Sequence, residues 1–184
     1  MSLFLRILDR LGVGIVLLLL GILLAFQTEY FLTWKNLSNI LTQTSVTLIM
    51  AVGMTFVITT AEIDLSVGSL FALCAMVSGM LLEAGHSIPA ALGAGMITGA
   101  ISGLIAGGIV VTWGLPSFIV TLGLLYIDRG IALLLTDAKP LYGFPEQFTV
   151  IAKGSLFGLP FPALEALAAV VLGQIVLSKT AFGR

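Results

Sequence analysis

The chain has 184 residues, 59% of them hydrophobic and 9% charged, and its mean hydropathy is +1.17. Because soluble domains carry about 25% charged residues, this composition predicts an integral membrane protein. The formal net charge of −1 does not indicate nucleic-acid binding. The one cysteine, Cys74, excludes a disulfide framework and a cysteine metal site, and the one histidine, His86, leaves little for a metal cluster or a catalytic triad.

Long uncharged stretches predict an all-α polytopic fold with about six transmembrane helices. A bilayer core of about 30 Å requires roughly 20 apolar residues in a helix. The first stretch follows two arginines, as in a signal peptide, but it is longer than a usual signal core and lacks a cleavage site, so an uncleaved span is expected. In chain order, the expected spans lie near residues 11–28, 37–60, 65–82, 88–112, 117–135 and 162–178 of a single transmembrane domain.

The connections between the spans give the expected orientation. The fourth and fifth spans are separated at Trp113–Ser117, where Pro116 disfavours helix in the residue before it. A polar connection rich in proline and glycine precedes the sixth span and is expected outside the membrane. Six spans place both termini on one side, which the positive-inside rule makes the cytoplasm. The basic residues on that side are Arg6, Arg10, Lys179 and Arg184, and those opposite are Lys35, Lys139 and Lys153.

The fourth span carries a glycine at every fourth residue. Ala91 and the four glycines share one helix face, where missing side chains let another helix approach closely. One interpretation is a helix packed beside a substrate path, and the other, which the pattern favours, is tight packing alone. Both predict a helix inside a bundle rather than one facing lipid. The glycines are Gly95, Gly99, Gly103 and Gly107.

Two carboxylates, Glu62 and Asp64, lie between the second and third spans in the stretch TTAEIDLSVGSL. In one interpretation they occupy an interfacial turn, where Asp64 caps the third span by accepting from the amide of Ser66 or Val67. In the other, the segment is unwound below the membrane surface and presents polar groups to a hydrophilic solute. Spacing alone favours the turn. Paired acid catalysis is the weakest interpretation, because no partner or metal motif accompanies the pair.

Two further sets of polar residues fall within the spans, where ionisable groups are functional candidates by default. Asp128 and Arg129 lie in the fifth span and point about 100° apart on a helix, so they do not face each other. We expect them to support the bundle through an ion pair with another span. Asn39, Gln43 and Thr44 form a neutral set at the start of the second span.

Three stretches resemble the signature motifs of one protein family. Ile63–Ser69 reads IDLSVGS, Gly114–Gly123 reads GLPSFIVTLG and is followed by Arg129-Gly130, and Thr180–Arg184 reads TAFGR. In this order and spacing they resemble the sugar permeases of binding-protein-dependent ABC importers. That is the ribose, xylose and arabinose class, which is distantly related to branched-chain amino acid permeases. The resemblance covers nearly the whole chain.

The chain departs from the family pattern at three places. Glu62 stands where glycine is commoner, and Ala106-Gly107 stands where an asparagine usually precedes the glycine in the fourth span. Asp128 stands where an apolar or small residue is more usual. The missing asparagine removes a polar side chain from a sugar path, so the sugar is left open.

The resemblance implies the membrane-spanning subunit of an ATP-driven importer that translocates a monosaccharide such as ribose, xylose or a related sugar. Members of the family have about ten helices, so this chain is expected to be an N-terminal fragment with six of them. It would be a truncated product, one part of a split gene or an incomplete gene model, and would not transport alone. Phe182, Gly183 and Arg184 would begin the segment that docks on the ATPase.

The resemblance also implies the site and the partners. Glu62, Asp64, Ser66 and Ser69 are expected at or near the solute path. No catalytic residue, metal or cofactor is expected in this chain, because ATP would be hydrolysed by a separate cytoplasmic subunit and no G-x-x-x-x-G-K-[ST] stretch occurs. A periplasmic or lipid-anchored solute-binding protein and a second permease copy, identical or homologous, complete the expected complex in the plasma membrane of a bacterium or archaeon.

Two other functions compete with this one. A secondary transporter of a small polar solute would use Glu62 or Asp64 for proton coupling and would need no ATPase. The function of an intramembrane enzyme is disfavoured, because the chain has one histidine and no nucleophile–base pattern.

Overall fold

The computed structural model describes the backbone of residues 3–180 and the side chains of residues 11–180. The all-α class is confirmed, because two strands of two residues each are the only β structure in this part of the chain. The helices are α1 (Leu3–Gln27), α2 (Trp34–Thr59), α3 (Val67–Glu83), α4 (Ile88–Trp113), α5 (Ser117–Leu135), α6 (Glu146–Lys153) and α7 (Phe161–Lys179); the strands are β1 (Ser155–Leu156) and β2 (Leu159–Pro160).

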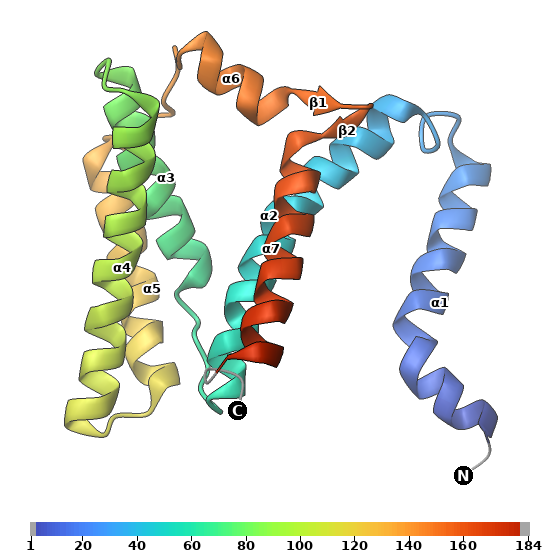
Figure 1. Ribbon diagram of the computed structural model, residues 1–184, viewed down its shortest axis with the longest axis horizontal. Coiled ribbons are helices and arrows are strands. Elements are labelled where there is room, and N and C mark those ends of the chain that lie inside the picture. Colours follow the sequence, from blue (N-terminus) through green and yellow to red (C-terminus); the bar gives the residue numbers. More distant parts are fainter. Residues whose placement is uncertain (1–2, 181–184) are drawn as a thin grey trace.

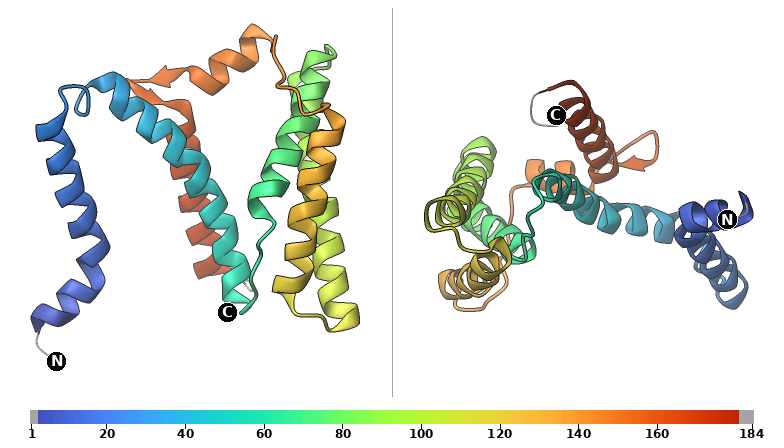
Figure 2. Two further views of the ribbon diagram at one scale, coloured as in Figure 1. Left: turned by 180° about the vertical axis from the view of Figure 1, so that it is seen from behind. Right: turned by 90° about the horizontal axis from the view of Figure 1, so that it is seen from below.

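Three groups of helices make up the molecule (Figure 1). α3, α4 and α5 form one bundle, α2 packs along α7, and α1 stands apart from both groups. α6 and the antiparallel β1–β2 hairpin cross between the bundle and the α2–α7 pair at one end, and the two further views agree (Figure 2). We call this end the hairpin side, and the opposite end, where α1 begins and α7 ends, the terminal side.

The long helices have the length and composition of membrane spans. α2, α4, α5 and α7 are long and apolar enough to cross a bilayer, while α3 and the apolar part of α1, Leu11–Gln27, are shorter apolar helices. Large apolar side chains point outward, and Leu18 of α1, Leu104 of α4 and Leu172 of α7 are 63%, 75% and 62% exposed. Apolar surface of this extent suits lipid as the surrounding solvent. The chain is a multi-pass membrane protein.

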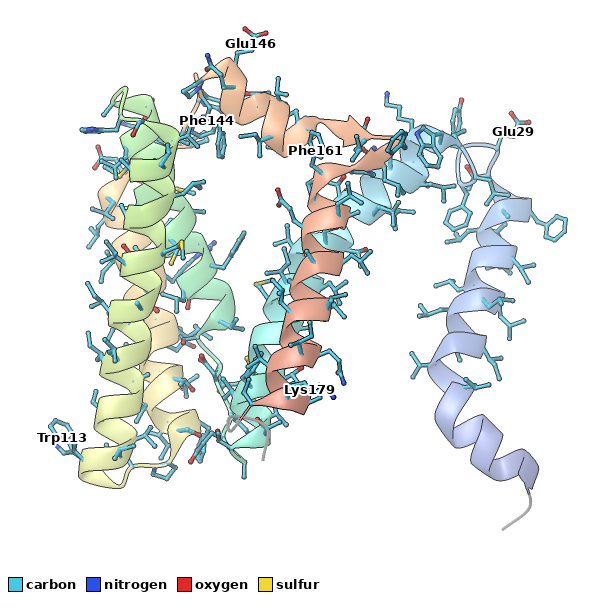
Figure 3. The ribbon with its side chains drawn as sticks, viewed as in Figure 1. Glu29, Trp113, Phe144, Glu146, Phe161 and Lys179 are labelled. Atoms are coloured by element: carbon cyan, nitrogen blue, oxygen red, sulfur yellow. The ribbon has the colours of Figure 1, made fainter. Side chains whose placement is uncertain are left out.

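Charged and aromatic residues mark the two ends of the apolar zone (Figure 3). Trp113 at the end of α4 and Lys179 at the end of α7 lie on the terminal side, whereas Glu29 and Glu146 lie on the hairpin side. Tryptophan and charged side chains prefer the membrane–water interface. The two sides of the molecule therefore correspond to the two faces of a membrane.

Glycines permit the closest helix contacts in both groups. A Cβ on Gly95 of α4 would collide with the hydroxyl of Ser78 and lie 3.1 Å from the carbonyl oxygen of Cys74, both on α3. A Cβ on Gly173 of α7 would lie 2.7 Å from a methyl group of Val52 on α2. Without a hydrophobic force between helices in lipid, such close approach supplies the packing energy that joins them.

The other glycines of the α4 stripe differ along the helix. A Cβ on Gly99 would make an ordinary contact with the sulfur of Cys74, at 3.4 Å, whereas nothing lies within 4 Å of such an atom on Gly103 or Gly107. The half of the stripe nearer the hairpin side therefore faces α3. A packing role for the last two glycines stays a prediction.

α2 ends in a Schellman motif that turns the chain out of the helix. The amide of Glu62 donates to the carbonyl of Val57 at 3.4 Å, and the amide of Ala61 donates to that of Ile58 at 2.9 Å. Ala61 has a φ of +60°, a left-handed conformation in which glycine is the usual residue. The turn satisfies two of the last carbonyls of α2 and directs the chain into segment 60–66.

Substitution of Gly95 tests the close contact between α3 and α4. Gly95→Val should lower the free energy of unfolding by about 1–3 kcal/mol, because the added methyl groups would overlap α3. Gly103→Val is the matched control on the same helix, since it projects into open space. The thermal unfolding midpoints of the purified variants in detergent measure the difference, and equal midpoints would contradict this account of the contact.

Candidate functional site

The candidate site is the segment 60–66, which belongs to no helix or strand. α3 has 17 residues and α4 has 26, so at 1.5 Å per residue α3 is about 13 Å shorter. The two helices meet at a short turn on the hairpin side, which leaves the start of α3 well inside the length of the bundle. Figure 1 shows the segment rising from the terminal side to that point. This is the geometry of an unwound segment rather than of a turn at the edge.

Two hydroxyl groups of α5 bind the backbone of this segment. Ser117 Oγ accepts from the amide of Ile63 at 3.1 Å, and Thr121 Oγ1 accepts from the amide of Leu65 at 3.1 Å. Thr121 Oγ1 also lies 3.3 Å from the carbonyl oxygen of Ile63 and 2.9 Å from that of Ser117, to either of which its proton can be donated. Thr121 is only 4% exposed. One turn of α5 therefore replaces the hydrogen bonds that a helix would have supplied.

The carboxylate of Asp64 organises the start of α3. Its Oδ1 accepts from the amide of Ser66 at 2.7 Å and from the hydroxyl of Ser66 at 2.6 Å. The hydroxyl of Ser69 donates to the carbonyl of Ser66 at 2.8 Å. Ser66 and Ser69 are buried, while Asp64 is half-buried, and its second oxygen has no hydrogen-bond partner among residues 11–180. Asp64 thus fixes the turn that leads into α3, whose N-cap residue is Ser66, and retains a free acceptor.

The four residues expected near the solute path lie together, but they have different roles. The hydroxyls of Ser66 and Ser69 are buried and hydrogen-bonded within the segment, so they hold its shape. Glu62 and Asp64 are half-buried, and the side chain of Glu62 makes no hydrogen bond or ion pair within the described part of the chain. The two carboxylates are therefore the groups of this set that remain available to a solute.

Sequence reasoning missed Ser117 and Thr121. Both belong to the GLPSFIVTLG motif, and their spacing of four residues puts them on one face of α5. The structure brings this motif against the IDLSVGS motif, more than fifty residues earlier, through the amides of Ile63 and Leu65, which donate to Ser117 and Thr121. The signal available in the sequence was a pair of hydroxyl residues one helical turn apart at the start of a span.

The ion pair expected between the fifth span and another span is not formed among the described residues. Asp128 is 3% exposed and accepts from the hydroxyl of Ser102 on α4, at 3.2 Å from Oδ2. Arg129 is exposed, and no carboxylate within residues 11–180 lies at ion-pair distance from it. Neighbouring positions on a helix point about 100° apart, so α5 buries one of these side chains and exposes the other. Asp128 therefore joins α5 to α4 by a hydrogen bond.

The remaining candidates lie outside this site. Asn39, Gln43 and Thr44 are exposed on α2, and His86 is exposed in the turn between α3 and α4. Phe182, Gly183 and Arg184, the expected start of the ATPase-coupling segment, lie outside the described residues. Within the described residues, no group of three or more histidine, cysteine or acidic side chains is arranged to hold a metal ion.

Comparison with known proteins places the chain among transport proteins. Residues 36–184 match the family described as "Branched-chain amino acid transport system / permease component". The D-allose transport system permease protein AlsC of Escherichia coli (strain K12) is 36% identical over 178 residues, which cover 96% of this chain and 55% of that protein. No solved structure matches the chain significantly.

Two further relatives agree with this match. The autoinducer 2 import system permease protein LsrC of Escherichia coli (strain SMS-3-5 / SECEC) is 34% identical over 170 residues, covering 92% of this chain and 50% of that protein. The L-arabinose ABC transporter permease protein AraH of Azospirillum brasilense is 33% identical over 181 residues, which cover 97% of this chain and 53% of that protein. The chain spans about half the length of the curated relatives it matches. The chain therefore belongs to the family of branched-chain amino acid transport permease components, and the resemblance carried by its motifs is confirmed.

Proposed function

We propose that the chain forms part of the membrane-spanning permease subunit of an ATP-driven ABC importer that translocates a monosaccharide such as ribose, xylose or a related sugar. Family membership and the names of the relatives, which include allose and arabinose permeases, support this proposal. The observation that carries it is the non-helical segment 60–66 bound to the start of α5. Transporters use unwound segments of this kind to present polar groups to a solute inside the membrane.

The chain performs no bond chemistry in this proposal. The carboxylates of Glu62 and Asp64 accept hydrogen bonds from sugar hydroxyls, and the apolar walls of the surrounding helices exclude bulk water. Ser117 and Thr121 tie the segment to α5, so the segment moves with the α3–α5 bundle as one body. Segments 60–66 and 136–160 connect this bundle to the α2–α7 pair, and rocking of one group against the other would alternate access between the two membrane faces.

The proposal includes three partners. A cytoplasmic ATP-binding subunit hydrolyses ATP, a periplasmic or lipid-anchored solute-binding protein delivers the sugar, and a second permease copy completes the path. The protein lies in the plasma membrane of a bacterium or archaeon with its N-terminus in the cytoplasm. The hairpin side then faces outward toward the solute-binding protein. The segment that begins at Phe182 couples to the ATPase on the other face.

Uptake by the complete transporter in proteoliposomes tests the source of energy. Uptake of ribose, xylose or arabinose should continue when an ionophore collapses the proton gradient and should stop when ATP is omitted. The opposite pattern would contradict the proposal and favour a proton-coupled secondary transporter. Absence of uptake of all three sugars, with every subunit present, would also contradict it.

Two substitutions at Asp64 distinguish a structural role in the turn before α3 from direct contact with the solute. Asparagine retains an oxygen that can accept from Ser66 but loses the charge, whereas alanine loses both. If Asp64 contacts the sugar, Asp64→Asn and Asp64→Ala should each lower uptake by about tenfold at equal amounts in the membrane, since a hydrogen bond to a charged group contributes about 1.5–3 kcal/mol. Normal uptake in the asparagine variant together with loss in the alanine variant would mean that Asp64 only holds the turn before α3.

A further inference from the structure

A polar patch occupies one face of α2 near the middle of the helix. It consists of Asn39, Gln43, Thr44 and Thr47, all of which are exposed. None of these four side chains forms a hydrogen bond or ion pair with any residue in the described part of the chain. Gln43 and Thr47 are the tenth and fourteenth of the 26 residues of α2, so the patch lies within the membrane-spanning length.

Four other polar side chains of α2 have partners within the chain. The hydroxyls of Thr42, Ser45 and Thr55 each donate to a carbonyl of the preceding turn, at 2.9, 2.5 and 2.8 Å. The side-chain amide of Asn36 donates to the carbonyl of Phe31 at 2.9 Å. The four side chains of the patch differ from these, because they form no hydrogen bond within the described part of the chain. Their amides and hydroxyls are left open to something outside this part of the chain.

The patch faces away from the partner helix of α2. Val52 of α2 packs against Gly173 of α7. Gln43 precedes Val52 by nine residues, which at 100° per residue places it on about the opposite side of the helix. An unpartnered amide or hydroxyl in hydrocarbon loses its hydrogen bonds to water, at a cost of roughly 2–7 kcal/mol. Because four such groups lie together, this face of α2 is unsuited to lipid and requires polar contacts, which water, a solute or another helix can supply.

A cavity continues the patch toward the hairpin side. This cavity measures about 440 Å³. Asn39 belongs to both the patch and this smaller cavity, which is also lined by Trp34, Ser38, Lys153 and Ser155. Trp34 as a whole is 58% exposed. Sites for small molecules have volumes of roughly 300–1,000 Å³ and combine an aromatic surface with a few polar groups.

We propose that this cavity and the polar patch form an entry site for a hydroxylated solute of monosaccharide size. The inference rests on the proposed function and assigns the binding of the sugar to residues outside segment 60–66. The indole of Trp34 covers an apolar face of the sugar ring, while the amides of Asn39 and Gln43 each offer both a donor and an acceptor to its hydroxyls. Thr44 and Thr47 extend the polar surface one turn deeper, toward the middle of the membrane.

Reaction of introduced cysteines with a charged, membrane-impermeant methanethiosulfonate tests the inference in the complete transporter. Cys74 is first replaced by alanine, and Gln43→Cys and Thr47→Cys then report on the patch. Leu172→Cys on the apolar surface of α7 is the matched control. Because the reactive form is the hydrated thiolate, both patch cysteines should react about tenfold faster than the control. Ribose, xylose and arabinose are the probes for protection, and a transported sugar should slow the reaction at least about threefold at a saturating concentration.

The outcomes are distinct. Reaction of either patch cysteine at the rate of the control overturns the inference, because the face is then covered by lipid or by another helix. Fast reaction that a transported sugar does not slow also overturns it, because the space is then wet but is not a sugar site. If the transporter with unaltered α2 takes up none of the three sugars, the proposed function itself fails, and the uptake measurement reports this separately from the labelling rates.

Discussion

Peptide groups inside a membrane need hydrogen-bond partners within the protein, and segment 60–66 is where this chain meets that need without a helix. A Schellman motif at Ala61 binds the last carbonyls of α2, and Ser117 and Thr121 then bind the non-helical backbone that follows. Asp64 binds the first free amide before α3. These bonds fix where α3 begins, how α5 lies against it and which carboxylates are left unoccupied.

The same constraint explains why two sequence motifs so far apart occur in one chain. The IDLSVGS stretch contributes the non-helical backbone, and the GLPSFIVTLG stretch contributes the hydroxyls that bind it. Neither stretch has this shape alone, because the amides of Ile63 and Leu65 would be unpaired without α5. Close helix contact at Gly95 joins α3 to α4, so the segment, its support and the bundle form one unit.

Much of the fold followed from composition and from where charges and prolines interrupt apolar stretches. The all-α class could be predicted in this way, because a 30 Å apolar layer admits few alternatives. The unwound shape of segment 60–66 was one of two interpretations, and sequence could not select it, since the spacing of Asp64 and Ser66 favours a turn at the membrane edge. The exposure of Arg129 and the bond from Ser102 to Asp128 depend on how α5 is rotated against α4, which local sequence does not specify.

Hydrogen exchange of the peptide that covers residues 60–66, measured by mass spectrometry on the complete transporter, tests the central claim most directly. If the α5 hydroxyls hold this segment, its amides should exchange slowly in the unsubstituted protein and faster in Thr121→Val. Thr98→Val is the control, because the hydroxyl of Thr98 donates to the carbonyl of Ala94 within its own helix. Exchange at the rate of an unstructured peptide in the unsubstituted protein, or no change in Thr121→Val, would contradict the account.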